Sequence, residues 1–276
     1  MKKILKIDYS DLDRPDILML LFHPRPEWDA PGMARGAAEV LIPVEEDIVV
    51  GARFHMSEER APNILFFHGN GEIVADYDEM GPLYNRIGVN FLPMDYRGYG
   101  RSTGEPTITN MMKDCHIIFD FVKNWLSEEG YKGPLILMGR SLGSASALEL
   151  VSHYKDEVDG LIIESGFAFS GPLFQLLGID LKAIDFKEEA GLGNLDKIRK
   201  VDKPTLIIHA ELDQIIPFSD GQALYDASPS RDKTLLKIPG ANHNDIFVRG
   251  LSEYMATIKT LTRKATRLQS SPHSAG

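Results

Sequence analysis

A serine between two glycines is the feature of the sequence that most suggests chemistry. The segment Gly139-Arg140-Ser141-Leu142-Gly143 follows a short apolar run, Leu135 to Met138, and precedes small helix-forming residues. A G-x-S-x-G pattern between a strand and a helix predicts a tight turn that lifts the serine hydroxyl above the edge of a sheet. Glycines are needed beside it because strand and helix converge there. The alternative is an ordinary glycine-rich turn, and the flanking strand and helix favour the nucleophile.

A nucleophilic serine also needs a base and an acid to orient that base. The hydroxyl is a poor nucleophile until a base accepts its proton, and an acceptor must hold the base in the right tautomer. His243 lies in a loop directly after a predicted strand at 234–238. Asp213 lies directly after the preceding predicted strand, 205–209. We therefore predict that His243 is the base for Ser141 and that Asp213 orients it.

Two other carboxylates are rivals for the role of the acid. Asp220 is close to Asp213 in sequence, but it belongs to a helix predicted to begin near Phe218. Glu211 comes two residues before Asp213. Because carboxylates in loops are commonly turn formers or helix caps, the sequence alone leaves both rivals open.

The elements that must position these residues follow from hydrophobic patterning. Two strands are predicted within residues 37–56, as a hairpin. Short apolar runs predict further buried strands at 64–67, 91–94, 135–138, 160–164, 205–209 and 234–238. Helices are predicted at 77–87, 114–129 and about 245–268. Strands that alternate with helices predict an α/β fold, with a mainly parallel sheet covered by helices on both faces. Ligands bind such sheets at the carboxyl ends of the strands, where Ser141, Asp213 and His243 lie.

Composition and charge exclude several classes of partner. A net charge of -10 argues against nucleic acid or an anionic membrane as the main partner. The single cysteine, Cys115, permits no internal disulfide, and its place in a helical pattern predicts a small buried hydrophobe. No apolar run is long enough to span a bilayer, and the first residues become acidic too early for a signal peptide. We therefore expect a soluble, cytoplasmic protein with no membrane span. The sequence predicts no oligomeric state.

Neither a metal nor a cofactor is expected. Gly98, Gly100 and Gly104 follow a strand, but the third glycine comes one position late for a dinucleotide-binding turn. The histidines show no H-E-x-x-H spacing and no pairing with cysteine, so a catalytic metal is not predicted. Basic residues near the C-terminus are interpreted as a solvated helix face rather than a nucleic-acid arm; they are Lys259, Arg263, Lys264 and Arg267.

Five motifs together make the sequence resemble the α/β-hydrolase-fold serine hydrolases, in particular small intracellular esterases and thioesterases with a His-Gly-Asn loop. The motifs are Ile64 to Gly71, Asp95 to Ser102, Gly139 to Gly143, Asp213 to Pro217 and Gly240 to His243. The order serine, acid, histidine is also that of this fold.

This resemblance implies roles for individual residues. Ser141 is the nucleophile, Asp213 the orienting acid and His243 the base, and the backbone N–H groups of Asn70 and Leu142 form the oxyanion hole. The segment Asp95–Ser102 is then a structural turn beside the active site.

Other parts of the chain lie outside the pattern. Residues 1–36 form an N-terminal arm without a counterpart, 37–269 the α/β-hydrolase domain, and 270–276 a C-terminal tail. Glu72, an acidic residue after the His-Gly-Asn-Gly loop, is interpreted as a carboxylate at a helix start.

Substrate choice is predicted to depend on residues 167–202, a small cap insertion over the serine. Its apolar residues Phe167, Phe169, Phe174 and Leu177 are the candidate pocket wall, and the alternative is a helix packed on the core. The predicted function is a serine-dependent acyl hydrolase that acts, without a cofactor, on a small-molecule ester or thioester of short to medium acyl chain. The alternatives are a peptidase or amidase of the same fold acting on short peptides, and a catalytically silent binding protein.

Overall fold

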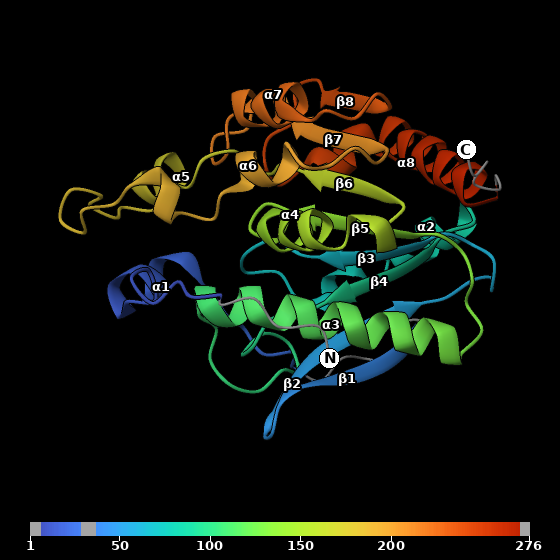
Figure 1. Ribbon diagram of the computed structural model, residues 1–276, viewed down its shortest axis with the longest axis horizontal. Coiled ribbons are helices and arrows are strands. Elements are labelled where there is room, and N and C mark those ends of the chain that lie inside the picture. The colour runs from blue at the N-terminus through green and yellow to red at the C-terminus, as the bar shows by residue number, and fades with distance from the viewer. Residues whose placement is uncertain (1–6, 29–36, 271–276) are drawn as a thin grey trace.

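The computed structural model describes residues 7–28 and 37–270, and these form one mixed sheet with helices packed on both faces (Figure 1). The strands are β1 (Ala37–Glu45), β2 (Ile48–His55), β3 (Asn63–Phe67), β4 (Asn90–Met94), β5 (Leu135–Arg140), β6 (Gly160–Glu164), β7 (Thr205–Ala210) and β8 (Lys233–Ile238). Their order in the sheet is β1-β2-β4-β3-β5-β6-β7-β8. The β1–β2 hairpin and the β2–β4 pair are antiparallel, and all other neighbours are parallel. The predicted α/β class with a mainly parallel sheet is confirmed.

The helices include the long C-terminal one predicted at about 245–268, which is confirmed. They are α1 (Pro15–Leu21), α2 (Gly81–Arg86), α3 (Ile108–Glu128), α4 (Gly143–His153), α5 (Ser170–Leu176), α6 (Asn194–Ile198), α7 (Phe218–Ala227) and α8 (Ile246–Ser270). Short 3-10 turns are η1 (Val74–Tyr77), η2 (Lys155–Glu157) and η3 (Glu188–Ala190). None of the helices in the described ranges is long and apolar enough to cross a membrane.

Two helix predictions need correction. The helix predicted at 77–87 is instead η1 followed by the short α2, which has proline in its first turn. Helix α3 begins at Ile108, six residues before the predicted start. Its first turn is capped by the Thr107 hydroxyl and by the Asp13 carboxylate, which accepts the Ile108 N–H at 2.8 Å. Asp13 lies in the N-terminal arm, so a distant segment adds to the local cap that Thr107 provides.

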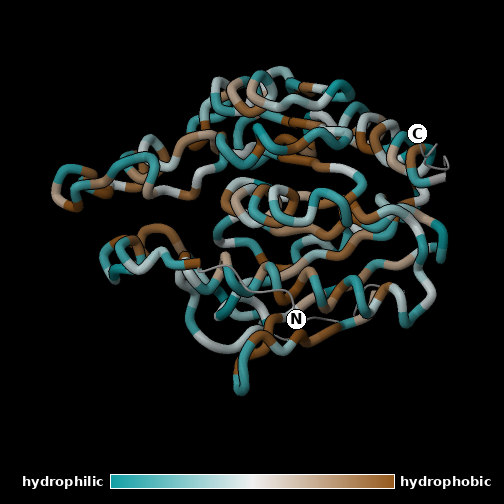
Figure 2. The backbone as a smooth tube through the Cα atoms, in the orientation of Figure 1, coloured by the Kyte–Doolittle hydropathy of each residue, from teal (hydrophilic) through white to brown (hydrophobic). Residues whose placement is uncertain are grey.

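The core has one layer on each face of the sheet because strand side chains alternate between faces. Leu65, Leu137 and Ile163 face the layer formed with α3 and α4, whereas Phe66, Met138 and Ile162 face α2 and α8. Figure 2 shows that hydrophobic residues line the strands of the sheet and that α1 and α5 also carry hydrophobic residues. Cys115 lies in the first layer and is 1% exposed, as predicted.

Helices α1 and α5 extend from the same side of the sheet (Figure 1). Helix α1 belongs to the predicted N-terminal arm, of which residues 1–6 and 29–36 lie outside the described residues. Helix α5 belongs to the predicted cap, 167–202, which also contains η3 and α6. The predicted tail is outside the described residues except for the end of α8.

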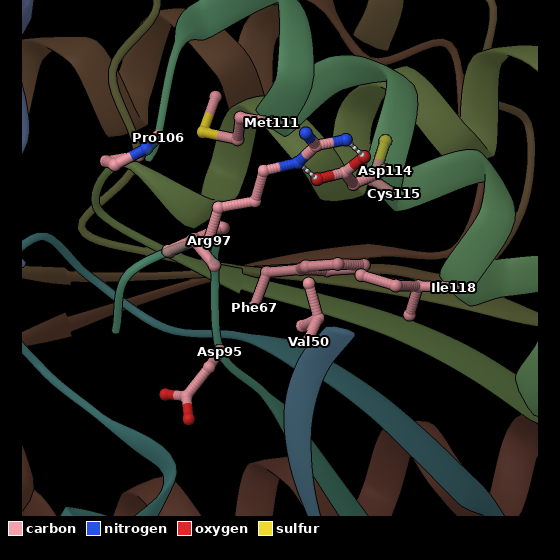
Figure 3. Close-up of a pocket in the computed structure, with 10 residues that line it drawn as sticks. Val50, Phe67, Asp95, Arg97, Pro106, Met111, Asp114, Cys115 and Ile118 are labelled. Carbon is pink, nitrogen blue, oxygen red and sulfur yellow. Dashed lines mark hydrogen bonds and ion pairs between the residues drawn. The ribbon is translucent and has the colours of Figure 1, made fainter. Parts of the chain in front are cut away.

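The turn Asp95–Ser102 links the sheet to α3 (Figure 3). The Arg97 guanidinium donates to both carboxylate oxygens of Asp114 on α3, at 2.7 and 2.9 Å. Asp95 points the other way, and its Oδ1 accepts from the Val74 N–H at 2.9 Å and lies 3.1 Å from His68 Nε2. These contacts hold the turn in place and are consistent with the structural role that the resemblance implies.

Candidate active site

Ser141 occupies a tight turn between β5 and α4. Its φ of 50° is in the left-handed region, which costs energy for a residue with a Cβ. The turn is enforced by its neighbours, because a Cβ on Gly139 would lie 2.3 Å from the Gly143 carbonyl oxygen, and one on Gly143 would lie 2.1 Å from that of Phe67. The Ser141 N–H donates to the Glu164 carbonyl of β6 at 2.9 Å. The close approach that the glycine spacing predicts is therefore present.

The structure brings Ser141, His243 and Asp213 into one hydrogen-bonded chain. His243 Nε2 lies 3.1 Å from Ser141 Oγ, and His243 Nδ1 lies 2.7 Å from Asp213 Oδ2. The other carboxylate oxygen, Asp213 Oδ1, accepts the backbone N–H groups of Ile215 and Ile216 at 3.0 and 2.8 Å. Burial alone would raise the pKa of Asp213, but these hydrogen bonds and the interaction with His243 lower it. Asp213 is therefore ionised and fixed in orientation.

The rival acids have other partners. Asp220, on α7, is buried and accepts the Ala168 N–H at 2.8 Å, so it holds the base of the cap segment. Glu211 is on the surface, where it accepts from Lys237 and from the Gly240 N–H. Neither carboxylate contacts His243 among the described residues.

A second histidine, His209, lies beside the acid. Its Nε2 is 2.8 Å from the Ile216 carbonyl oxygen and 3.6 Å from Asp213 Oδ2. Because a carbonyl oxygen can only accept, Nε2 carries the proton. Burial lowers the pKa of His209, so this ring packs as a neutral group against the acid loop.

The two predicted oxyanion donors border the same cavity as Ser141. In the part of the chain that the structure describes, the backbone N–H groups of Asn70 and Leu142 donate to no other group. Leu142 is the N-cap residue of α4, so its N–H also benefits from the positive end of the helix dipole. Both groups are therefore available to a ligand.

The side chain of Asn70 is held by the N-terminal arm. Asn70 Oδ1 accepts the Tyr99 hydroxyl at 2.7 Å and the His23 backbone N–H at 2.8 Å, which identifies it as the oxygen of the amide. Asn70 Nδ2, a donor, lies 2.7 Å from His23 Nδ1. His23 Nδ1 must therefore be an acceptor in this contact. Arg25 adds a bond to the Gly71 carbonyl at 2.7 Å, so residues 23–25 fasten the whole loop.

Glu72 has a different role from the predicted carboxylate at a helix start. Its Oε2 accepts the Gly69 N–H at 2.7 Å and the Tyr77 hydroxyl at 2.6 Å, while Oε1 accepts from Arg140 Nε at 2.8 Å. The first-turn carboxylate of η1 is Asp76, which accepts the Ile73 N–H. The prediction failed because it considered only local sequence, and Arg140 is distant along the chain.

Arg140 joins several loops of the site from beneath. Its side chain is 9% exposed and binds Glu72 on one side and Glu164 on the other, the latter at 2.7 Å. It also donates to the His243 backbone carbonyl at 3.0 Å. One guanidinium thus connects the loop of Asn70, the turn of Ser141 and the loop of His243.

A cavity of about 340 Å³ opens above Ser141. Its apolar lining comes from α1, the start of α4, the cap and the acid loop: Leu21, Leu142, Leu173, Leu177 and Ile215. Polar groups on the lining include Asn70, Glu72, His23, His243 and Asn244, and none of the lining residues within 7–28 and 37–270 is lysine or arginine.

Of the four predicted wall residues, only Leu177 borders this cavity. Phe174 and Phe167 are 0% and 1% exposed and belong to the core, where Phe174 packs edge-on against Phe186. Phe169 is 37% exposed and lies outside the lining. The prediction failed for these three because an apolar cluster in sequence does not tell which side chains meet the cavity: Phe174 is on the core side of α5, and Phe167 and Phe169 lie before that helix begins.

The chain resembles known proteins in sequence and in structure. The sequence model described as serine aminopeptidase, S33, matches residues 58–181, which include Ser141 but neither Asp213 nor His243. Alpha/beta hydrolase domain-containing protein 17B of Homo sapiens is 32% identical over 207 residues, covering 71% of this chain and 64% of that protein. Protein 17C of Mus musculus is 32% identical over 205 residues, covering 71% of this chain and 58% of that protein. The chain thus spans less than two thirds of the length of these relatives.

Among solved structures, the Pyrococcus furiosus esterase Pf2001 superposes with a TM-score of 0.69 at 17% identity, covering 87% of this chain and 98% of that chain. Est1E from Butyrivibrio proteoclasticus, bound to ferulic acid, superposes with a TM-score of 0.65 at 19% identity, covering 82% and 98%. At such identity these structures establish a shared fold.

Proposed function

The chain belongs to the α/β-hydrolase fold family, and from this premise we propose that it is a serine-dependent acyl hydrolase of carboxylic esters or thioesters. The observation that carries the proposal is the chain of hydrogen bonds from Ser141 through His243 to Asp213 beside the cavity. The two unengaged N–H groups of Asn70 and Leu142 complete the set of groups that acyl transfer requires.

The first half of the reaction forms an acyl-enzyme. Ionised Asp213 accepts the Nδ1–H of His243, which leaves the Nε2 lone pair directed at the Ser141 hydroxyl. Ser141 Oγ attacks the acyl carbonyl while His243 Nε2 takes its proton, and the carbonyl oxygen becomes an oxyanion. Collapse breaks the bond to the leaving oxygen or sulfur, which receives the proton from His243.

In the second half, water replaces the leaving group. His243 takes a proton from water as the water oxygen attacks the acyl carbon, and the same N–H groups stabilise the second oxyanion. Collapse then breaks the bond to Ser141 Oγ, which is reprotonated by His243, and the carboxylic acid leaves. No cofactor takes part in this sequence.

The cavity favours a short to medium acyl chain. Each methylene that leaves water for an apolar wall contributes about 0.8 kcal/mol, so kcat/KM rises with chain length until the space is filled. A volume of about 340 Å³ is at the lower end of the range for ligand pockets, which is about 300–1,000 Å³. A strongly anionic substrate is disfavoured because the lining offers no lysine or arginine.

A peptidase is the second candidate, favoured by the description of the matching family model. An aminopeptidase needs a group that accepts the free α-ammonium of its substrate. Glu72 is the lining carboxylate that could accept such an ammonium group, but both of its oxygens already accept hydrogen bonds from Gly69, Tyr77 and Arg140. The ester or thioester is therefore the better match.

A substrate panel tests the proposal. Purified protein is assayed with p-nitrophenyl acyl esters of increasing length, with acyl thioesters and with aminoacyl p-nitroanilides, beside a Ser141→Ala control. We expect ester or thioester turnover that depends on Ser141 and exceeds anilide turnover by about a hundredfold or more in kcat/KM, that is about 2.7 kcal/mol. Faster anilide cleavage would establish the peptidase instead, and a folded protein with no turnover of any class would favour a binding protein.

A further inference from the structure

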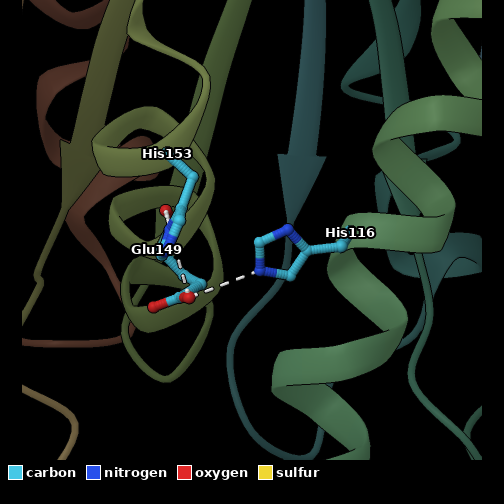
Figure 4. A group of neighbouring side chains, drawn as sticks. All are labelled: His116, Glu149 and His153. Atoms are coloured by element: carbon cyan, nitrogen blue, oxygen red, sulfur yellow. Dashed lines mark hydrogen bonds and ion pairs between the residues drawn. The ribbon is translucent and has the colours of Figure 1, made fainter. Parts of the chain in front are cut away.

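A cluster of metal-ligand side chains lies between α3 and α4, at the opposite end of α4 from Ser141. It consists of His116 on α3 with Glu149 and His153 on α4 (Figure 4). Counting about 1.5 Å per residue along α4, His153 is about 15 Å beyond Gly143. The cluster is thus separate from the proposed acyl-transfer site, and its role does not depend on that proposal.

The spacing of the three groups approaches that of a tetrahedral zinc site. One ligand atom from each residue lies within 4.8 Å of the others. Glu149 Oε1 is 3.3 Å from His116 Nε2 and 3.2 Å from His153 Nδ1. Two ligands about 2.1 Å from zinc at a tetrahedral angle are about 3.4 Å apart, so the edge between Glu149 Oε1 and His116 Nε2 has the required length.

The two edges to His153 require movement of its ring. Glu149 and His116 are nearly buried, with side chains 6% and 9% exposed, whereas the His153 side chain is 30% exposed. His153 Nδ1 now donates to the Glu149 backbone carbonyl at 2.9 Å, because a carbonyl oxygen can only accept, so this nitrogen must leave that contact before the ring can ligate. Because His153 lies at the protein surface, its ring can rotate so that one nitrogen points towards a metal. The same exposure leaves one coordination position of the metal open to water.

Outer partners hold two of the ligands in ligating form. His116 Nδ1 is 2.9 Å from the Tyr154 hydroxyl, so a proton on Nδ1 can be donated there and the Nε2 lone pair left for a metal. Lys197 on α6 pairs with the second oxygen, Glu149 Oε2, at 2.7 Å, leaving Oε1 free to ligate.

From this geometry we propose that His116, Glu149 and His153 bind a borderline divalent transition-metal ion, zinc in the first instance, which fastens α3 to α4. Two imidazoles and one carboxylate with an open position suit zinc, cobalt or nickel better than magnesium or calcium, which prefer all-oxygen sites. The Lys197 ammonium opposes the ion electrostatically and limits its affinity.

Titration of metal into chelator-treated protein without an affinity tag tests the site. Co²⁺ is followed by its visible d–d absorption, and Zn²⁺ by calorimetry and by the melting temperature. We expect one ion per chain and a rise of the melting temperature with Zn²⁺. His116→Gln and His153→Gln should each weaken binding by about a hundredfold or more, because losing a ligand exceeds the roughly 10- to 100-fold cost of losing an outer partner.

Matched variants keep the result unambiguous. His23→Gln, which alters an exposed histidine at the cavity above Ser141, should bind the metal like the wild type, and Lys197→Gln should bind it severalfold more tightly. His153→Gln alters a side chain that is 30% exposed and remains informative if His116→Gln fails to fold. The proposal is overturned by the lack of saturable binding in the wild type, or by binding that His153→Gln leaves unchanged.

Discussion

The ion pair between Glu72 and Arg140 provides the most quantitative prediction. Burial raises the pKa of Glu72, but the charge of Arg140 and the Tyr77 hydroxyl outweigh it and lower the pKa from 4.5 to about 2. A group whose pKa is lower in the folded state stabilises the fold above its unfolded pKa, and this contribution is lost as the pH falls through the folded value. The difference corresponds to about 3 kcal/mol at pH 7.

Replacing Glu72 by glutamine should therefore lower the free energy of unfolding at pH 7 by about 3 kcal/mol, the lower end of the range for breaking a buried pair. The lower end is expected because Arg140 keeps Glu164 as a partner. Between pH 7 and pH 3.5 the free energy of unfolding of the wild type should fall by about 1.4 kcal/mol through the titration of Glu72, and this part of the fall should be missing in the Glu72→Gln variant. Urea unfolding at several pH values measures both quantities.

The same variant should also impair turnover, because Glu72 holds the Gly69 N–H next to Asn70. We expect kcat to fall by about tenfold with little change in KM, less than the roughly 10²- to 10³-fold loss when an oxyanion donor is removed outright. Glu211→Gln, which removes an exposed carboxylate, is the control and should change neither stability nor kcat appreciably. If Glu72→Gln behaves like this control, Glu72 and Arg140 do not support the site as argued.

Three further predictions concern the site and its walls. Asp213→Asn should lower kcat by about 10⁴-fold with the fold intact, whereas Asp220→Asn should mainly lower the melting temperature; a mild Asp213→Asn with a severe kinetic defect in Asp220→Asn would reassign the acid. Leu177→Ala should change the dependence of kcat/KM on acyl-chain length, whereas Phe174→Ala should lower the free energy of unfolding in urea by about 3–5 kcal/mol. If Leu177→Ala leaves the chain-length profile unchanged, the cap does not take part in substrate recognition. His23→Ala should lower kcat more than it raises KM because Asn70 loses a partner, and His23→Gln, which keeps an acceptor, should restore part of the rate; equal rates in both variants would contradict this role.

Much of the architecture could be predicted because it depends on local pattern and on topology. The carboxyl ends of parallel strands meet at one edge of a sheet, so residues that follow β5, β7 and β8 are brought close even though they are far apart in sequence. This is why the positions of Ser141, Asp213 and His243 were accessible from strand patterns alone. The steric need for Gly139 and Gly143 is equally local.

The remaining features depend on contacts between distant segments. The partner of Glu72 is Arg140, and Asp13, which adds to the Thr107 cap of α3, is related to that helix by no local pattern. The wall of the cavity depends on which side of the short α5 faces inward, and there Phe174 takes the core side. The His116 cluster combines residues from two helices, so only Glu149 and His153, four residues apart on α4, have a recognisable spacing.

Labelling with a fluorophosphonate tests the central claim most directly. The folded protein is incubated with the probe, its intact mass is measured, and the modified residue is located by peptide mapping, with Ser141→Ala as the control. We predict one adduct per chain, on Ser141, and none on Ser141→Ala. An adduct at another residue, or a folded wild type that turns over esters yet remains unlabelled, would contradict the assignment of Ser141 as the nucleophile.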